Sequence, residues 1–171
     1  MAAKKSSPLK IIPLGGLDGI GKNMTVFECG DDMVLVDAGL MFPDDSQPGI
    51  DLVLPDYTYV LENEEKLRGI VIETFGAGNI PGDGNALLPI IRKAFQNGTV
   101  LTVCSQCPQG AVSLGTYETS SALKKAGAVS GLDMTTEAAV AKLYYLFSCG
   151  YDKEKIKQAM EENLRGEISV S

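Results

Sequence analysis

The stretch RGIVIETFGAGNIP (residues 68–81) joins an apolar, β-branched run to a glycine-rich turn. A run of this kind, bounded by Gly and Pro, is typical of a buried strand, so we expect a strand over residues 70–74. After it, helical patterns alternate with short apolar runs, which predicts a parallel sheet with helices on its faces. The expected helices are residues 85–97, 116–126, 137–149 and 153–165, and the other expected strands are residues 99–104 and 128–131.

The sequence before residue 68 has a different pattern. Short runs at residues 9–14, 24–29 and 33–37 predict three strands, and the Gly-Asp-Asp at residues 30–32 predicts a hairpin turn. The predicted fold class is therefore α/β, a parallel sheet with flanking helices preceded by a small antiparallel β segment.

An apolar run at residues 50–54 and a helical pattern at residues 57–67 connect these two parts, with Asp56 as the expected helix cap. Our hypothesis is that this strand and helix complete the parallel sheet by a right-handed crossover. Residues 50–54 would then lie parallel to residues 70–74. We expect domains at residues 1–69 and 70–171, with residues 50–69 completing the second sheet.

The composition disfavours several classes of function. The 171 residues are 44% hydrophobic and 22% charged, as in a globular protein. A net charge of −7 disfavours nucleic acid, because phosphate binding requires Lys and Arg, and suits a neutral ligand or a basic protein better. No apolar run approaches the ~20 residues that span a bilayer. The N-terminal residues lack the apolar region of a signal peptide, so we expect a cytoplasmic protein.

Histidine is absent, which removes His-dependent nucleophiles and His-containing zinc sites. We expect Cys29, Cys104, Cys107 and Cys149 to be reduced thiols. Cys104 and Cys107 have the CxxC spacing of a redox motif, but the sequence that follows is not a helix start. This favours a strand end over a redox site, and we expect no metal and no cofactor.

A second motif, GLDGIGKN (residues 16–23), nearly matches a phosphate-binding loop. Asn23 stands where that motif needs Ser or Thr, and a strand-like run follows where it needs a helix. We therefore expect a glycine-rich loop between two strands.

Two further stretches could suggest an active site. Thr135-Thr136-Glu137 offers a hydroxyl and a carboxylate, but the pattern is that of a helix cap. Tyr144 and Tyr145 lie in a helix that is apolar nearly all round, so we expect them in the core.

Residues 9–70 resemble the N-terminal edge of ribonuclease J, an RNase with the metallo-β-lactamase fold. The resemblance rests on GGLDGIGKNM, DAGLMFP and GIDLVLPD. In that family a His-x-His-x-Asp-His loop that binds two zinc ions follows the strand after RGI. Here the resemblance stops before that metal motif, and Glu73-Thr-Phe-Gly stands in its place. The family keeps Asp37 beside the metals, but this sequence has no such metal site for Asp37 to support. We expect no two-metal hydrolytic site.

From Gly69 onward the sequence resembles the C-terminal domain of type I L-asparaginases, on the motifs GIVIETFGAGNIP, SQCPQG, GTYETSSALKKAG, SGLDMTTEAAVAKLYYL and NLRGE. The resemblance implies a domain that pairs with itself and, in some bacterial members, holds part of an allosteric amide site. Cys107 corresponds to a Cys of that site, whereas Glu73 stands where some members have Arg. The nucleophilic Thr of the family, with its Thr-Asp pair and Lys, lies in an N-terminal domain that no part of this sequence resembles. The candidate ligand-binding residues are Asn79, Ser105, Gln106 and Cys107.

The sequence thus predicts a catalytically incomplete chimera that acts by binding or self-association through its asparaginase-like domain. Two alternatives stay open. An acidic inhibitor or antitoxin-like protein would bind a basic protein partner through charge complementarity. A residual amidohydrolase or asparagine-binding module would keep the amide site. We expect no nucleic-acid and no membrane partner.

Overall fold

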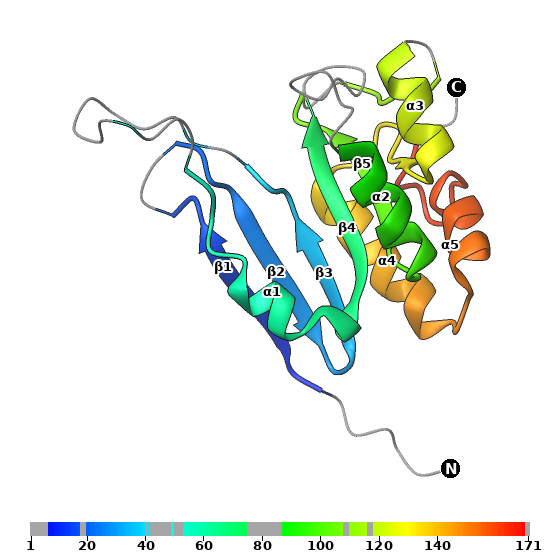
Figure 1. Ribbon diagram of the computed structural model, residues 1–171. Helices are drawn as coiled ribbons and strands as arrows, with labels where there is room; N and C mark the ends of the chain where they lie inside the picture. The colour runs from blue at the N-terminus through cyan, green and yellow to red at the C-terminus, as the bar shows by residue number, and fades with distance from the viewer. Residues whose placement is uncertain are drawn as a thin grey trace, which may run out of the picture. The chain divides into compact units, whose positions relative to one another are not determined.

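The computed structural model describes residues 7–17, 20–39, 41, 49, 53–74, 87–107, 110–115 and 118–169, without the side chains of residues 87–91, 118–120 and 122. The chain divides into two compact units, Met1–Leu67 and Arg68–Ser171. Figure 1 shows the elements of each unit.

The first unit contains three antiparallel strands: β1 (Leu9–Gly15), β2 (Met24–Cys29) and β3 (Asp32–Val36). Alternate residues of β2 are buried, as expected for a strand with one covered face. Gly30 has a φ of +64°, which the tight turn between β2 and β3 requires and which Gly adopts without strain. The three predicted strands and the hairpin turn are confirmed.

The predicted strand at residues 50–54 falls mainly on residues 50–52, which lie outside the described residues. Val53 is described, and it pairs with Met41 in an isolated antiparallel bridge whose N–H···O distances are 2.9 and 3.0 Å. At Val53 the observed pairing is therefore antiparallel and lies within the first unit.

The helix predicted at residues 57–67 is shorter than expected. Helix α1 spans Thr58–Glu62, and a 3-10 turn, η1, follows at Glu64–Lys66. The Asn63 side chain donates to the carbonyl of Tyr59 at 3.0 Å, the acceptor that the Asn63 N–H would use in a continuing α-helix. Asn63 thus ends the helix by taking its carbonyl. The N-cap of α1 is Tyr57, which makes no side-chain cap hydrogen bond, so the prediction of Asp56 as the cap is wrong by one position. Asp56 still accepts a hydrogen bond from the Thr58 N–H at 3.0 Å.

The second unit contains the predicted parallel sheet. Strand β4 (Leu67–Thr74) pairs with β5 (Val100–Ser105), and β5 pairs with β6 (Val129–Ser130), both in parallel. The helices are α2 (Leu87–Gln96), α3 (Glu118–Ala126), α4 (Thr136–Ser148) and α5 (Lys153–Met160). The α/β fold class, with an antiparallel segment ahead of a parallel sheet, is confirmed. Among the described residues, no helix combines the length and apolar character needed to cross a membrane.

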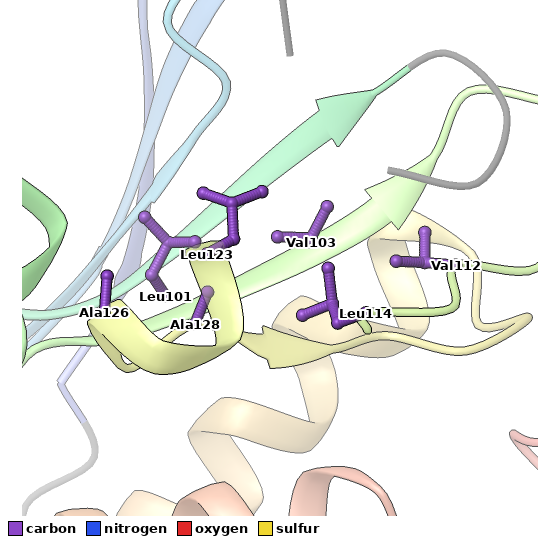
Figure 2. Close-up of a cluster of buried hydrophobic side chains, with 7 residues drawn as sticks. All are labelled: Leu101, Val103, Val112, Leu114, Leu123, Ala126 and Ala128. Atoms are coloured by element: carbon purple, nitrogen blue, oxygen red, sulfur yellow. The ribbon is translucent and has the colours of Figure 1, made fainter. Parts of the chain in front are cut away.

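The core of the second unit lies on both faces of β5, of which every residue from Val100 to Cys104 is buried. Helix α2 lies in front of β5 and α4 behind it, and both contact it (Figure 1). Figure 2 shows one buried cluster, in which side chains of β5 and α3 meet those of the connecting segments. Its members are Leu101, Val103, Val112, Leu114, Leu123, Ala126 and Ala128.

Two predictions about the C-terminal helices are wrong. Tyr145 is 51% exposed instead of packing in the core, whereas Lys142, on the same helix, is buried. Helix α5 ends at Met160 instead of residue 165. It ends there because the Glu167 carboxylate accepts the N–H groups of Leu164 and Arg165, which a continuing helix would direct to its own carbonyls.

Candidate functional site

The second unit has a hollow of about 280 Å³ where β4 and β5 end and α4 begins. Glu73 reaches it from β4, Ser105 from the end of β5, and Thr136 from the first turn of α4. Ligands of parallel α/β sheets generally bind outside the carboxyl ends of the strands. The hollow is therefore placed where this fold class usually holds a ligand.

The turn after β5 forms one wall of the hollow. Ser105 Oγ accepts the Cys107 N–H at 3.2 Å, and the Gln106 N–H donates to the Thr74 carbonyl at 2.9 Å. The backbone of Gly110 packs closely against Ser105, because a Cβ on Gly110 would lie only 2.3 Å from Ser105 Oγ. A side chain at position 110 would displace this wall.

The start of α4 forms another wall of the hollow. Thr135 Oγ1 accepts the Ala138 N–H at 3.2 Å and so caps the helix, which confirms the prediction that this stretch is a cap. Thr136 Oγ1 donates to Glu73 Oε1 at 2.6 Å and joins α4 to the end of β4. The pKa of Glu137 is lowered by its own backbone N–H and by the Thr135 hydroxyl.

A third carboxylate, Asp133, lines the hollow from the segment between β6 and α4. Both of its oxygens accept the Ser169 N–H, at 3.0 and 3.1 Å, and Ser169 accordingly lowers the pKa of Asp133. Acidic residues therefore line the hollow from β4, from α4 and from the loop before α4. None of its described lining residues is Lys or Arg.

Cys104 and Cys107, the CxxC pair, differ in environment. Cys104 is fully buried, and burial, together with the nearby Glu73 and Glu137, raises the pKa of its thiol to about 12. Cys107 is exposed and lines the hollow. A redox CxxC depends on an accessible thiol of lowered pKa, so this arrangement is unlike a thioredoxin-type site.

Of the candidate ligand-binding residues, Ser105, Gln106 and Cys107 lie together in the hollow. Asn79 lies outside the described residues. Glu73, Asp133 and Thr136 also line the hollow and were not among the candidates. The sequence could have indicated two of them, because Glu73 lies near the end of one predicted strand and Asp133 closely follows another. The ends of parallel strands form the sheet edge where ligands generally bind.

The first unit has a separate hollow of about 350 Å³ at the glycine-rich loop between β1 and β2. Its lining includes Leu17, Ile20 and Lys22. A strand, β2, follows the loop, whereas a phosphate-binding loop leads into the N-terminus of a helix. The prediction of a glycine-rich loop between strands is confirmed.

Asp37, the residue that ribonuclease J keeps beside its metals, follows β3 directly and has a φ of +59°. Its Oδ1 accepts the Ala38 N–H at 2.9 Å. Within the part of the chain that the structure describes, no three His, Cys, Asp or Glu residues are grouped as metal ligands would be.

Residues 41–160 match the family model of the glutaminase/asparaginase C-terminal domain, which is more than half of the chain. The chain belongs to this family. Among solved structures, L-asparaginase I from Vibrio cholerae is similar over 80% of this chain and 37% of its own, with 34% identity and a TM-score of 0.60. The thermostable L-asparaginase from Thermococcus kodakarensis is similar over 73% of this chain and 36% of its own, with 31% identity and a TM-score of 0.58.

A second likeness accompanies the asparaginase C-terminal domain. Ribonuclease J 2 of Staphylococcus aureus is 56% identical over 69 residues, which are 40% of this chain and 12% of that protein. The chain thus spans about an eighth of this curated relative and little more than a third of the asparaginase structures. Both resemblances found in the sequence are confirmed.

Proposed function

We propose that this protein is a non-catalytic chimera that acts by binding, with the hollow of its asparaginase C-terminal domain as the ligand site. The observation that carries the proposal is the convergence of Ser105, Gln106 and Cys107 with Glu73 and Thr136 around one hollow. These residues supply hydroxyl, amide, thiol and carboxylate groups, which suit a small polar ligand.

The same geometry argues against acyl transfer in the hollow. Thr136 and Glu73 are within hydrogen-bond distance, as a nucleophile and base would be, but amide hydrolysis also needs donors for the developing oxyanion. The N–H groups of Gln106, Cys107 and Ala138 are already directed at protein oxygens. The carboxylates of the hollow would repel a second negative charge.

Self-association is the second part of the proposal, and it follows from the resemblance to a domain that pairs with itself. On the described part of the second unit, Tyr145 is the one large hydrophobic side chain that is more than a third exposed. An interface with so little apolar surface would be weak, so we expect a dimer only at high protein concentration.

Two measurements test the proposal. An ammonia-release assay with L-asparagine and L-glutamine should give no signal above the buffer, and sustained release would overturn the non-catalytic assignment. A two-dimensional ¹H–¹⁵N NMR titration with small amides and amines should move the amide signals of residues 105–107 and 135–137. If no ligand of that panel moves them, the hollow is not a binding site.

Light scattering tests the self-association separately. The apparent mass should rise from that of the 18.1 kDa monomer as the concentration is raised to tens of micromolar and above. A constant monomer mass over this range would refute self-association and leave the ligand site unaffected.

A further inference from the structure

The segment after α5 ends in a turn that side chains hold together, and we call residues 163–169 the strap. Asn163 donates to the Ile168 carbonyl at 2.6 Å and accepts the Gly166 N–H at 2.7 Å. Glu167 accepts two further N–H groups of the same turn. Ile168 is buried, so the strap is packed and does not extend into solvent.

Two side chains outside the strap hold it in place. Glu167 pairs with the buried Lys142 of α4 at 2.8 Å, and the Ser169 N–H donates to both Asp133 oxygens at 3.0 and 3.1 Å. Among the described residues, no backbone-to-backbone hydrogen bond joins the strap to the rest of the second unit. A segment fixed in this way can open without unfolding the sheet, because local opening costs only the contacts that it breaks.

The loop of residues 131–134, between β6 and α4, is the part of the unit that the strap holds. Leu132 has a φ of +53°, a left-handed backbone conformation that is disfavoured for Leu. Its N–H donates to Ser130 Oγ at 3.0 Å, and its carbonyl accepts the Val112 N–H at 2.8 Å. The next residue is Asp133, which the Ser169 N–H holds. The loop is therefore strained and is kept in its conformation by bonds on both sides.

We propose that the strap closes one wall of the hollow, and that the strap and the loop open together as one local unit. When Glu167 leaves Lys142, the contact between Ser169 and Asp133 is lost as well and the loop relaxes. The wall then changes shape, because the loop contributes lining residues to the hollow. The role of this opening as a gate for a ligand rests on the proposed function. The opening itself is measured without a ligand, so the two proposals can fail separately.

Native-state amide hydrogen exchange of the full chain, followed by NMR, measures the opening. The reporter amides are those of Leu132 and Met134 in the loop and Leu164 and Gly166 in the strap, all of them hydrogen-bonded. In the wild type they should share one protection factor, at least about tenfold below that of the buried strand β5. Protection equal to that of β5 would mean that they open only in global unfolding. Protection that differs between loop and strap would mean separate openings, and either result overturns the inference.

Two substitutions, each measured in the segment that is not mutated, test the coupling. Glu167→Gln removes the charge that pairs with Lys142 and should lower the protection of the loop amides by about 5- to 20-fold. Asp133→Ala removes the acceptor of the Ser169 N–H and should lower the protection of the strap amides by about 3- to 10-fold. Asp133→Asn keeps an acceptor oxygen and should retain most of the protection. Because coupling is reciprocal, an effect confined to the mutated segment refutes the inference.

Glu162→Gln is the matched control for Glu167→Gln. Glu162 is exposed directly before the strap, and its carboxylate bonds Gln158, whereas Lys142 contacts its backbone carbonyl. The substitution changes the net charge equally and should alter the protection of the loop amides by less than about twofold, since exposed charges are screened. Equal lowering by both variants would mean a general effect of charge and would overturn the inference.

Discussion

Substitution of Lys142 by Met tests how the second unit is held together. Lys142 lies in the middle of α4 and is 5% exposed. Its Nζ donates to the carbonyls of Met160 and Glu162 and to Glu167 Oε1, the last at 2.8 Å. The buried Lys142 ammonium group on α4 therefore binds both the end of α5 and the segment that follows α5.

The size of the effect follows from what the substitution leaves behind. Removing one partner of a buried ion pair costs about 3–5 kcal/mol when the other charge stays buried without compensation. The Glu167 side chain is 15% exposed, so water screens part of this cost. Glu167 keeps the N–H groups of Leu164 and Arg165, at 3.0 and 2.6 Å, which stabilise its charge in part. We therefore expect Lys142→Met to lower the free energy of unfolding of the second unit by about 3 kcal/mol, the low end of that range.

Urea unfolding followed by far-UV circular dichroism measures the loss. Amide hydrogen exchange of α4 and residues 161–169 assigns the loss to the second unit, since the chain has two compact units. Lys125→Met on α3 is the control, because Lys125 is exposed, and we expect a change within about 0.5 kcal/mol.

The double variant Lys142→Met/Glu167→Gln should recover part of the loss, because a neutral amide leaves no buried charge. The reasoning is refuted if Lys142→Met costs less than about 1 kcal/mol, the net worth of an ordinary hydrogen bond. It is also refuted if adding Glu167→Gln makes the protein less stable still.

Three further predictions concern acidity, capping and reactivity. Burial alone would raise the pKa of Glu167, but Lys142 and neighbouring N–H groups hold it at about 2, below its ordinary 4.5. A lowered carboxyl pKa contributes stability above pH 4.5 that is lost as the pH falls toward 2. The free energy of unfolding measured in urea should therefore fall between pH 7 and pH 3 by roughly 1–2 kcal/mol more in the wild type than in Glu167→Gln, after screening. Thr135→Ala removes the cap of α4 and should cost about 1 kcal/mol in thermal unfolding, whereas Thr135→Asp should keep most of it. Iodoacetamide at pH 8 should label the exposed Cys107 and leave the buried Cys104, whose pKa is about 12, unlabelled. Peptide mass spectra measure both reactions, and labelling of Cys104 in the folded protein would contradict its burial.

The sequence was sufficient for the order and type of most described elements. The exceptions are the strand expected at residues 50–54, where Val53 makes only an isolated antiparallel bridge, and the helix expected at residues 57–67, which is shorter. In β5, five consecutive buried residues leave no polar face, and their apolar run is visible in the sequence as a strand covered on both sides. Thr135 was recognisable as a cap because capping depends on residues only three positions apart. Local chemistry of this kind is readable without the fold.

Contacts between distant residues could not be predicted in the same way. Lys142 lies in an apolar helix, and the acceptors that allow its burial come from residues 18 to 25 positions later, two of them backbone carbonyls without any sequence signature. The pair Thr136 and Glu73 is separated by 63 positions. Because ligands of parallel sheets bind outside the carboxyl ends of the strands, the sequence indicated the sheet edge that carries the candidate site. It did not indicate which carboxylate and which hydroxyl form a hydrogen bond there.

The two buried charges of the described residues, Glu28 and Lys142, bear on how one chain can contain sequence similar to two families. Glu28 in β2 is 3% exposed, and its pKa is lowered first by the Lys10 side chain at 2.7 Å and then by the Tyr59 hydroxyl at 2.8 Å. Both partners lie in the first unit, just as the acceptors of Lys142 all lie in the second. A buried ion that loses its partner is far more costly than an exposed one, so a junction is tolerated only where it separates no buried pair. The boundary between the compact units, at Leu67 and Arg68, separates neither buried charge from its partners. The family match of residues 41–160 begins before this boundary, so Tyr59, a partner of Glu28, lies within the matched residues.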